Sequence, residues 1–325
     1  MKRFFEWGNR LHTGESSIPF VGKSKLWLTI AAVLTVLSIL VPVFGGFNLG
    51  IDFRGGSQFQ VDHVATDKVD AASQAVTDAV GAANPSVVPT TNDTLKIETD
   101  QLSDEQMQQV RDSLVSHLQV DNSDVTSNFI GPQWGADVTQ KMARALIIFV
   151  ALAMVFMAIY FRTWKMSLAA ILGLVFVMVL TMGIYSATGF EVTPEAVIGF
   201  LTVLSFSLYD TVVVFDKIRE TTQDFGSAKD RTFSELVNLG INQTTVRSIN
   251  TTIIAALPIG AILFIGVFLL GAGTLTDISL SLFVGTVVAA ASTLFVASPL
   301  YAVLRSTEKK VKEQEARVLE ARPAA

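Results

Sequence analysis

Six long runs of apolar residues constrain this chain more than any other feature. They are residues 26–44, 145–161, 166–187, 196–215, 253–271 and 278–304, and the one charged residue they contain is Asp210. An α-helix needs about 20 apolar residues to cross the roughly 30 Å hydrocarbon core of a bilayer. The runs lack the period-two alternation of membrane β-strands. The sequence therefore predicts an α-helical polytopic membrane protein with six transmembrane helices.

The charge content supports this interpretation. Charged residues make up 16% of the 325 residues, whereas a soluble domain carries about 25%. Nearly all of the charge lies outside the six runs, so a lipid-soluble and a water-soluble composition are combined in one chain. A single soluble core or a disordered chain is excluded. The sequence has no cysteine, which excludes a disulfide framework and a thiolate nucleophile.

Basic residues predict the orientation in the membrane. Residues 1–25 and 216–252 carry five Lys or Arg each, and the tail from residue 305 carries six. The short connections 186–195 and 272–277 on the opposite side carry none. Because short cytoplasmic loops are enriched in Lys and Arg, we expect both termini in the cytoplasm. The expected segments are a cytoplasmic N-terminus (1–25), a first helix (26–44), an extracytoplasmic domain (45–142), a five-helix bundle (143–304) with a cytoplasmic loop (216–241), and a cytoplasmic tail (305–325).

The predicted extracytoplasmic segment has the pattern of a small α+β domain. Residues 57–64, 94–99 and 125–130 favour strands, residues 85–89 a short extended piece, and residues 68–80 a helix. Ser103 and Gln106 have the spacing of a capping box before a second helix that runs to about Leu118. The order strand, helix, strand, strand, helix, strand is that of a ferredoxin-like module. With five basic and fourteen acidic residues, the segment is unsuited to binding nucleic acid.

Asp210 is the leading candidate for a functional residue. A carboxylate at the bilayer centre costs on the order of 2.5–3.5 kcal/mol, so it must face the bundle interior, find a partner or be protonated. Ser207 and Thr211 lie close to it on the same predicted helix and place hydroxyl groups beside it. The alternative is a static, hydrogen-bonded Asp that only fixes helix packing.

Arg247 is the predicted partner of Asp210. Residues 242–252 are polar but continue in helical register into the fifth run, with Gln243, Arg247, Asn250 and Thr251 on one face. If the fourth helix ends near residue 216 and the fifth begins near residue 241, both charges lie six residues inward, about 9 Å at 1.5 Å per residue. An ion pair is then geometrically feasible. The alternative is that Arg247 extends to the cytoplasmic headgroups.

A pair of this kind fits a proton carrier better than an enzyme. Arginine favours the ionised form of an aspartate and desolvation favours the neutral form, so small movements change its protonation. The three histidines lie outside the runs, which leaves no intramembrane zinc site. A phosphate-binding G-x-x-x-x-G-K motif is absent, and so is the second carboxylate of an intramembrane aspartyl protease. We expect no enzymatic activity, no cofactor and no bound metal.

Three motifs resemble the SecD/SecF family of bacterial protein-export membrane components. Residues 50–56, Gly-Ile-Asp-Phe-Arg-Gly-Gly, are similar to its G-x-D-F-x-G-G signature, and residues 206–220 and 242–252 are similar to the fourth-span and fifth-span signatures of its SecF branch. The resemblance covers about residues 26–305 and assigns Gly50, Asp52, Gly55 and Gly56 to the signature. We interpret Asp52 as structural, satisfying backbone donors in a turn; a role in coupling the outer domain to the first helix is the alternative.

The resemblance also implies a function and a set of partners. Members pair with SecD, associate with the SecYEG channel, act after the SecA motor and with YidC/YajC-like accessory proteins, and use proton flux to move outer domains that pull or release the exported unfolded polypeptide. It implies a location in the bacterial plasma membrane, a proton relay at Asp210 with Arg247, and support from Ser207, Thr211, Gln243 and Asn250. Two alternatives stay open: a proton-coupled small-molecule exporter of the same superfamily, and a non-catalytic assembly scaffold.

Overall fold

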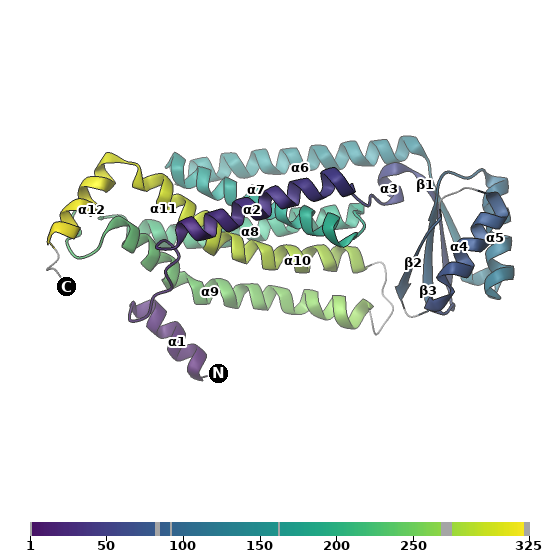
Figure 1. Cartoon of the computed structure of the whole chain (residues 1–325), viewed down its shortest axis with the longest axis horizontal. Coiled ribbons are helices and arrows are strands. Elements are labelled where there is room, and N and C mark those ends of the chain that lie inside the picture. The colour runs from purple at the N-terminus through teal and green to yellow at the C-terminus, as the bar shows by residue number, and fades with distance from the viewer. Residues whose placement is uncertain (1, 82–84, 92, 162, 268–274, 322–325) are drawn as a thin grey trace.

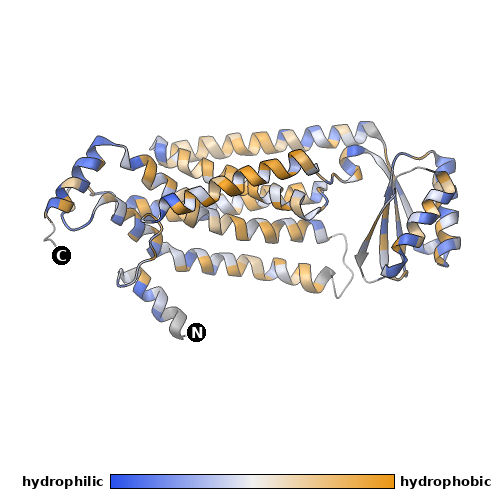
Figure 2. Cartoon of the chain, viewed as in Figure 1, coloured by the Kyte–Doolittle hydropathy of each residue, from blue (hydrophilic) through white to orange (hydrophobic). Residues whose placement is uncertain are grey.

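The computed structural model describes residues 2–81, 85–91, 93–161, 163–267 and 275–321. Within them, six helical spans are long and apolar enough to cross a membrane, which confirms the predicted fold class. They are α2 (Ser24–Gly45), α6 (Pro132–Phe161), α7 (Trp164–Thr188), α8 (Pro194–Thr221), α9 (Phe233–Ala261) with the π-turn η3 (Ile262–Val267), and α10 (Thr276–Ser292) with the π-turn η5 (Thr293–Ala297) and α11 (Ser298–Ser306). Figures 1 and 2 show these apolar helices side by side in one bundle.

Several boundaries differ from the expectation. The connection between α8 and α9 comprises residues 222–232 rather than 216–241, because α8 continues to Thr221 and α9 begins at Phe233. Thr232 and Glu235 form a capping box at the start of α9. A search for apolar runs does not detect this polar first turn. Both terminal segments also contain helices that we did not predict, α1 (Lys2–Thr13) and α12 (Lys309–Ala321). Residues 268–271 of the fifth run lie outside the described residues.

The segment between α2 and α6 folds as the predicted α+β domain at one end of the bundle (Figure 1). Its elements are α3 (Ile51–Arg54), β1 (Gly56–Asp62), η1 (Thr66–Lys68), α4 (Val69–Val80), β2 (Ser86–Thr91), β3 (Thr94–Thr99), α5 (Asp104–Leu118), η2 (Asn122–Asp124) and β4 (Val125–Ile130). The antiparallel sheet has the order β2-β3-β1-β4, as expected for a ferredoxin-like module. Ser103 and Gln106 form the predicted capping box of α5.

The domain core lies between the sheet and its two helices. Alternate residues of β1 and β3 point into it, so Phe59 and Val61 pack with Leu95 and Ile97, and Leu114 of α5 closes the cluster. All five side chains are fully buried. Burial of a large apolar side chain contributes about 1.5–3 kcal/mol, so this small domain has a core of its own.

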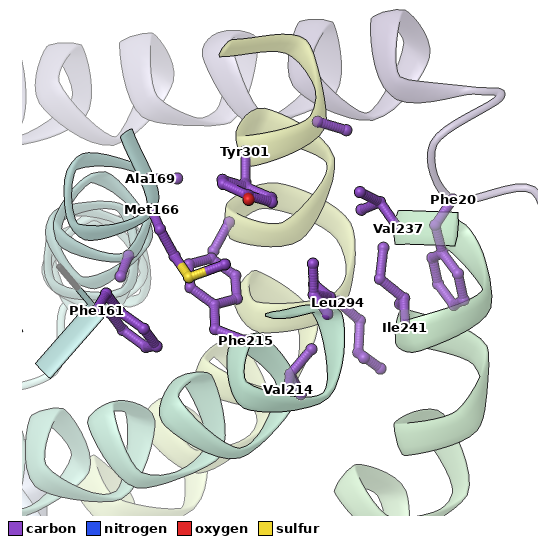
Figure 3. Close-up of a cluster of buried hydrophobic side chains, with 14 of the residues drawn as sticks. Phe20, Phe161, Met166, Ala169, Val214, Phe215, Val237, Ile241, Leu294 and Tyr301 are labelled. Atoms are coloured by element: carbon purple, nitrogen blue, oxygen red, sulfur yellow. The ribbon is translucent and has the colours of Figure 1, made fainter. Parts of the chain in front are cut away.

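The bundle has its largest apolar cluster at the end away from the α+β domain. Figure 3 shows side chains from α6, α7, α8, α9 and α11 converging there, among them Phe161, Met166, Phe215, Val237 and Tyr301. All five are almost completely buried. The cluster fixes the ends of α8 and α9 relative to each other, and these two helices carry the candidate site.

Small residues let the central helices approach closely. On α10, Gly285 faces α8, and a Cβ atom at this position would lie 2.6 Å from a methyl carbon of Val203. In lipid, where helices gain little from the hydrophobic effect, such close packing is a main source of association. The contact holds α10 against α8 along the segment that contains Asp210.

Candidate functional site

Asp210 lies in the middle of α8 and is buried between helices, with 4% of its surface exposed. The hydroxyl of Ser248 on α9 lies 2.9 Å and 2.8 Å from its two carboxylate oxygens. Ser248 itself is 2% exposed. The contact therefore joins α8 to α9 through one carboxylate and one hydroxyl that are both shielded from the surface.

The last span provides a second hydroxyl. The Thr293 side chain is within hydrogen-bonding reach of the Asp210 carboxylate, and its Oγ1 lies 3.2 Å from Oγ1 of Thr211. Thr293 is the first residue of η5, where the backbone carbonyl of Thr293 accepts a hydrogen bond from the Ser298 hydroxyl at 2.8 Å. Single π-turns within helices occur frequently at functional sites. Asp210 thus faces hydroxyls from two other helices.

Arg247 lies on a different face of α9 from Ser248. Its side chain is exposed and lines a cavity of about 610 Å³ at the bundle end away from the α+β domain. The other lining residues are Val213, Asp216, Lys217, Arg219, Glu220, Gln223 and Thr244. Among the described residues, no ion pair within 4.0 Å joins Arg247 to Asp210. The functional pairing of these two residues stays a prediction.

The predicted supporting residues divide between the two faces. Ser207 and Thr211 are buried on α8, as expected for neighbours of Asp210. Gln243 and Asn250 are half-buried on α9, whereas Thr244, Thr245 and Ser248 of α9 are buried and Ser248 contacts Asp210 of α8. Sequence reasoning missed Ser248 and Thr293. The available signal for Ser248 was its position one turn beyond Thr244 and Thr245, because hydroxyls at three- and four-residue spacing share a helix face.

The glycine-rich signature forms the joint between the α+β domain and the bundle. The backbone N–H of Gly50 donates to Val192 O at 3.0 Å, and Val192 N–H donates to Asn48 O at 2.7 Å. Gly55 and Gly56 have φ angles of 76° and 153°, which favour glycine because it lacks a Cβ atom. At Gly56 a Cβ atom would also lie 2.6 Å from Thr99 O. The signature glycines therefore shape this joint.

Asp52 lies in the first turn of α3 inside the joint, where the N-terminal end of a helix favours negative charge. Burial, followed by the nearby Glu195 carboxylate, raises the pKa of Asp52 above its ordinary value. Among the described residues, no group of three or more His, Asp or Glu side chains is arranged to hold a metal ion.

Comparison with known proteins identifies two family models. Residues 110–307 match the model "Protein export membrane protein SecD/SecF, C-terminal", and residues 42–62 match "SecD/SecF GG Motif". The chain is 41% identical over 316 residues to Protein translocase subunit SecF of Streptomyces coelicolor, covering 96% of this chain and 83% of that protein. It is 36% identical over 324 residues to the Mycobacterium tuberculosis subunit of the same name, covering 97% and 73%.

Two solved structures share the fold. SecDF from Thermus thermophilus, described as a translocon-associated membrane protein, superposes with a TM-score of 0.79 at 26% identity over 90% of this chain. A super-membrane-facing form of SecDF gives a TM-score of 0.65 at 26% identity over 93% of this chain. The match spans 39% and 40% of those two longer chains.

Proposed function

Because the chain belongs to the SecF branch of the SecD/SecF family, and is thus an accessory subunit of the Sec translocase, we propose that it couples proton movement to protein export. In this proposal Asp210 takes up and releases the proton, and the α+β domain acts on the exported unfolded polypeptide late in translocation. The observation that carries the proposal is the buried contact of Asp210 with Ser248.

Hydroxyl neighbours suit a carboxyl group that changes its protonation. An ionised Asp210 accepts a hydrogen bond from the Ser248 hydroxyl, and a protonated Asp210 can donate to the same hydroxyl oxygen, because a hydroxyl is both donor and acceptor. A buried carboxylate fixed by an arginine would favour one state strongly. Each protonation state of Asp210 therefore has hydrogen-bond partners without a change of fold.

Arg247 is proposed to assist proton transfer between Asp210 and water. Arg247 immediately precedes Ser248 in α9 and lines the 610 Å³ cavity described above. A rotation of α9 by about 100°, the angle between consecutive helical residues, would bring Arg247 in place of Ser248 to face Asp210. We propose that this exchange alternates the carboxyl between the hydroxyl contact and the guanidinium, with Ser207, Thr211, Gln243 and Asn250 as polar neighbours along the route.

The proposed partners are SecD, which would supply further carboxylates, and the SecYEG channel with SecA and YidC/YajC-like proteins. The solved relatives support a SecD partner. This chain matches about two fifths of the length of each SecDF chain, and the rest of SecDF would correspond to the partner. We propose a multi-pass location in the bacterial plasma membrane, with both termini cytoplasmic and the α+β domain outside. The basic residues near the termini support this orientation.

The test is export of a preprotein and proton flux in membrane vesicles that contain the chain with its SecD partner. Asp210→Asn keeps the side-chain size and removes the titratable group, so we expect proton-dependent export to fall by about 10-fold or more, as for loss of a proton-transfer group. Asp112→Asn, on the exposed face of α5, is the matched control. Wild-type export and flux with Asp210→Asn in an assembled complex would favour the scaffold function and reject the proton carrier.

A further inference from the structure

A second group of ionisable side chains lies at the joint between the α+β domain and the bundle. Lys96 of β3 extends its Nζ atom to within 2.6 Å of Glu191 Oε2, in the connection between α7 and α8. The same Nζ lies 2.9 Å from Glu98 Oε1, and Arg54 Nη2 lies 3.0 Å from Glu98 Oε2. The contact between Lys96 and Glu191 therefore crosses from the domain to the bundle.

These groups are shielded from solvent. The Glu98 side chain is 7% exposed, Glu191 19% and Lys96 22%. Glu98 Oε1 is buried, and the Lys96 Nζ atom that lies 2.9 Å from it also contacts Glu191. One ammonium group thus lies between two carboxylates that are shielded from solvent. A proton on Glu191 would add a second donor toward Glu98.

Negative charge exceeds positive charge at the joint. Lys96 and Glu98 on β3 lie next to Glu191, and the other charged groups of the joint, which interact with these two, are Arg54 and Asp52 on α3, Glu195 on α8 and Asp277 on α10. Two cations thus face five carboxylates in total. Two carboxylates that lie close together readily share one proton, because the repulsion between two negative charges disfavours the state in which both are ionised.

We propose that Glu191 and Glu98 share a proton over Lys96 and that this proton fastens the α+β domain to the bundle. In the docked joint, the protonated Glu191 donates a hydrogen bond to Glu98, and Lys96 and Arg54 offset part of the remaining negative charge. The inference extends the proposed function, because it adds a proton site outside the membrane helices to the one at Asp210. It concerns domain docking, which can be measured without transport.

The sign of the pH dependence follows from the joint. Burial, with a further contribution from Glu98, raises the pKa of Glu191 to about 7 in the docked state. If the domain moves away and Glu191 enters water, its pKa returns toward its ordinary value of 4.5. Docking therefore takes up a proton between these values. The docked state is favoured at low pH and weakens as the pH rises through 7.

The experiment measures the distance between the domain and the bundle in the full chain, reconstituted in lipid nanodiscs. The chain has no cysteine, so spin labels attach only at Asp112→Cys on α5 and Ala187→Cys on α7, which are both exposed. Double electron–electron resonance is recorded from pH 5 to pH 8. At low pH we expect a single short distance between the two labels. As the pH rises, we expect a second population with a longer distance to grow, and the midpoint of this change should lie near pH 7.

Three variants test the assignment. Glu191→Gln resembles the protonated acid and should stay docked across the range, while Glu98→Gln should move the midpoint to lower pH because Glu98 raises the pKa of Glu191. Glu105→Gln, exposed on α5, is the control and should behave as wild type. A distance that is independent of pH in the wild type, or an unchanged midpoint in Glu191→Gln, would overturn the inference.

A fourth variant separates this inference from the proton carrier. With Asp210→Asn the pH dependence of docking should persist, because Asp210 does not belong to the joint. If Asp210→Asn impairs export but the distance between the labels does not change with pH, only the joint proposal fails. If the distance changes with pH but Asp210→Asn leaves export and proton flux at the wild-type level, only the proton-carrier proposal fails.

Discussion

The hydroxyl of Ser248 bridges both carboxylate oxygens of Asp210 at 2.9 Å and 2.8 Å, so a single side chain of α9 holds the buried charge of α8. Removing one partner of a buried polar pair leaves the other unsatisfied, at a cost of about 1–3 kcal/mol and more for a charged group. The two helices are therefore coupled through the candidate site itself.

Ser248→Ala should slow proton-dependent export several-fold, by less than Asp210→Asn does, because Thr293 still reaches the carboxylate. The rate of preprotein export in vesicles, measured at several pH values, checks this. Ser205→Ala is the control, since among the described residues this exposed hydroxyl of α8 donates to Leu201 O of its own helix and to no other residue. Equal rates for Ser248→Ala and wild type would mean that the bridge is dispensable.

Arg247→Ala should reduce proton flux while leaving thermal stability nearly unchanged, because the side chain is exposed and makes no ion pair within 4.0 Å among the described residues. Arg247→Lys keeps the charge and loses the planar fork, so we expect intermediate flux. Lys217→Ala, which lines the same cavity, is the control. Full flux in Arg247→Ala would discard its role in the relay.

Gly285→Ala should destabilise the bundle by about 1–3 kcal/mol, the usual cost of overpacking, because the added Cβ would meet Val203 at 2.6 Å. The midpoint of thermal unfolding in detergent measures the loss. Gly226→Ala is the matched control, since a Cβ atom there meets nothing within 4 Å among the described residues. Similar midpoints for both variants would contradict the close approach of α8 and α10.

Gln314 attaches α12 to the connection between α8 and α9. Its Oε1 accepts from Phe233 N at 3.0 Å, and its Nε2 donates to Arg231 O at 2.9 Å. Gln314→Leu removes the partner of the buried Phe233 N–H and of the Arg231 carbonyl, so hydrogen exchange at residues 228–233 should accelerate, corresponding to about 1–3 kcal/mol. The exposed Glu313→Ala is the control. Unchanged exchange in Gln314→Leu would mean that α12 does not fix this connection.

Local patterns predicted most of the fold. The apolar runs identified six spans, and alternation with a capping box at Ser103 identified the strands and α5 of the α+β domain. The start of α9 was wrong because its first turns are amphipathic: Asn238 and Asn242 bind the backbone of residues 18–21. These amides are satisfied by a segment more than 200 positions earlier, and no local pattern contains that contact.

The candidate site was predicted in part. The cost of a charge in an apolar run identified Asp210, but the face of α9 that meets it depends on helix rotation, which tertiary packing sets. Arg247 and Ser248 are consecutive residues and point in directions about 100° apart, as 3.6 residues per turn requires. The joint between Lys96 and Glu191 could not be predicted, because only the chain topology brings these residues together.

Helix α6 continues directly from the α+β domain, beginning at Pro132 two residues after β4 ends at Ile130. Its 30 residues form a rod of about 45 Å, and near its far end the Tyr160 hydroxyl donates to Asp216 Oδ2 on α8 at 2.7 Å. A tilt of the α+β domain would therefore be transmitted through α6 to α8, about two turns beyond Asp210. The α+β domain and the helix that carries Asp210 are thus joined by one continuous helix and one side-chain hydrogen bond, so a displacement of either strains the other.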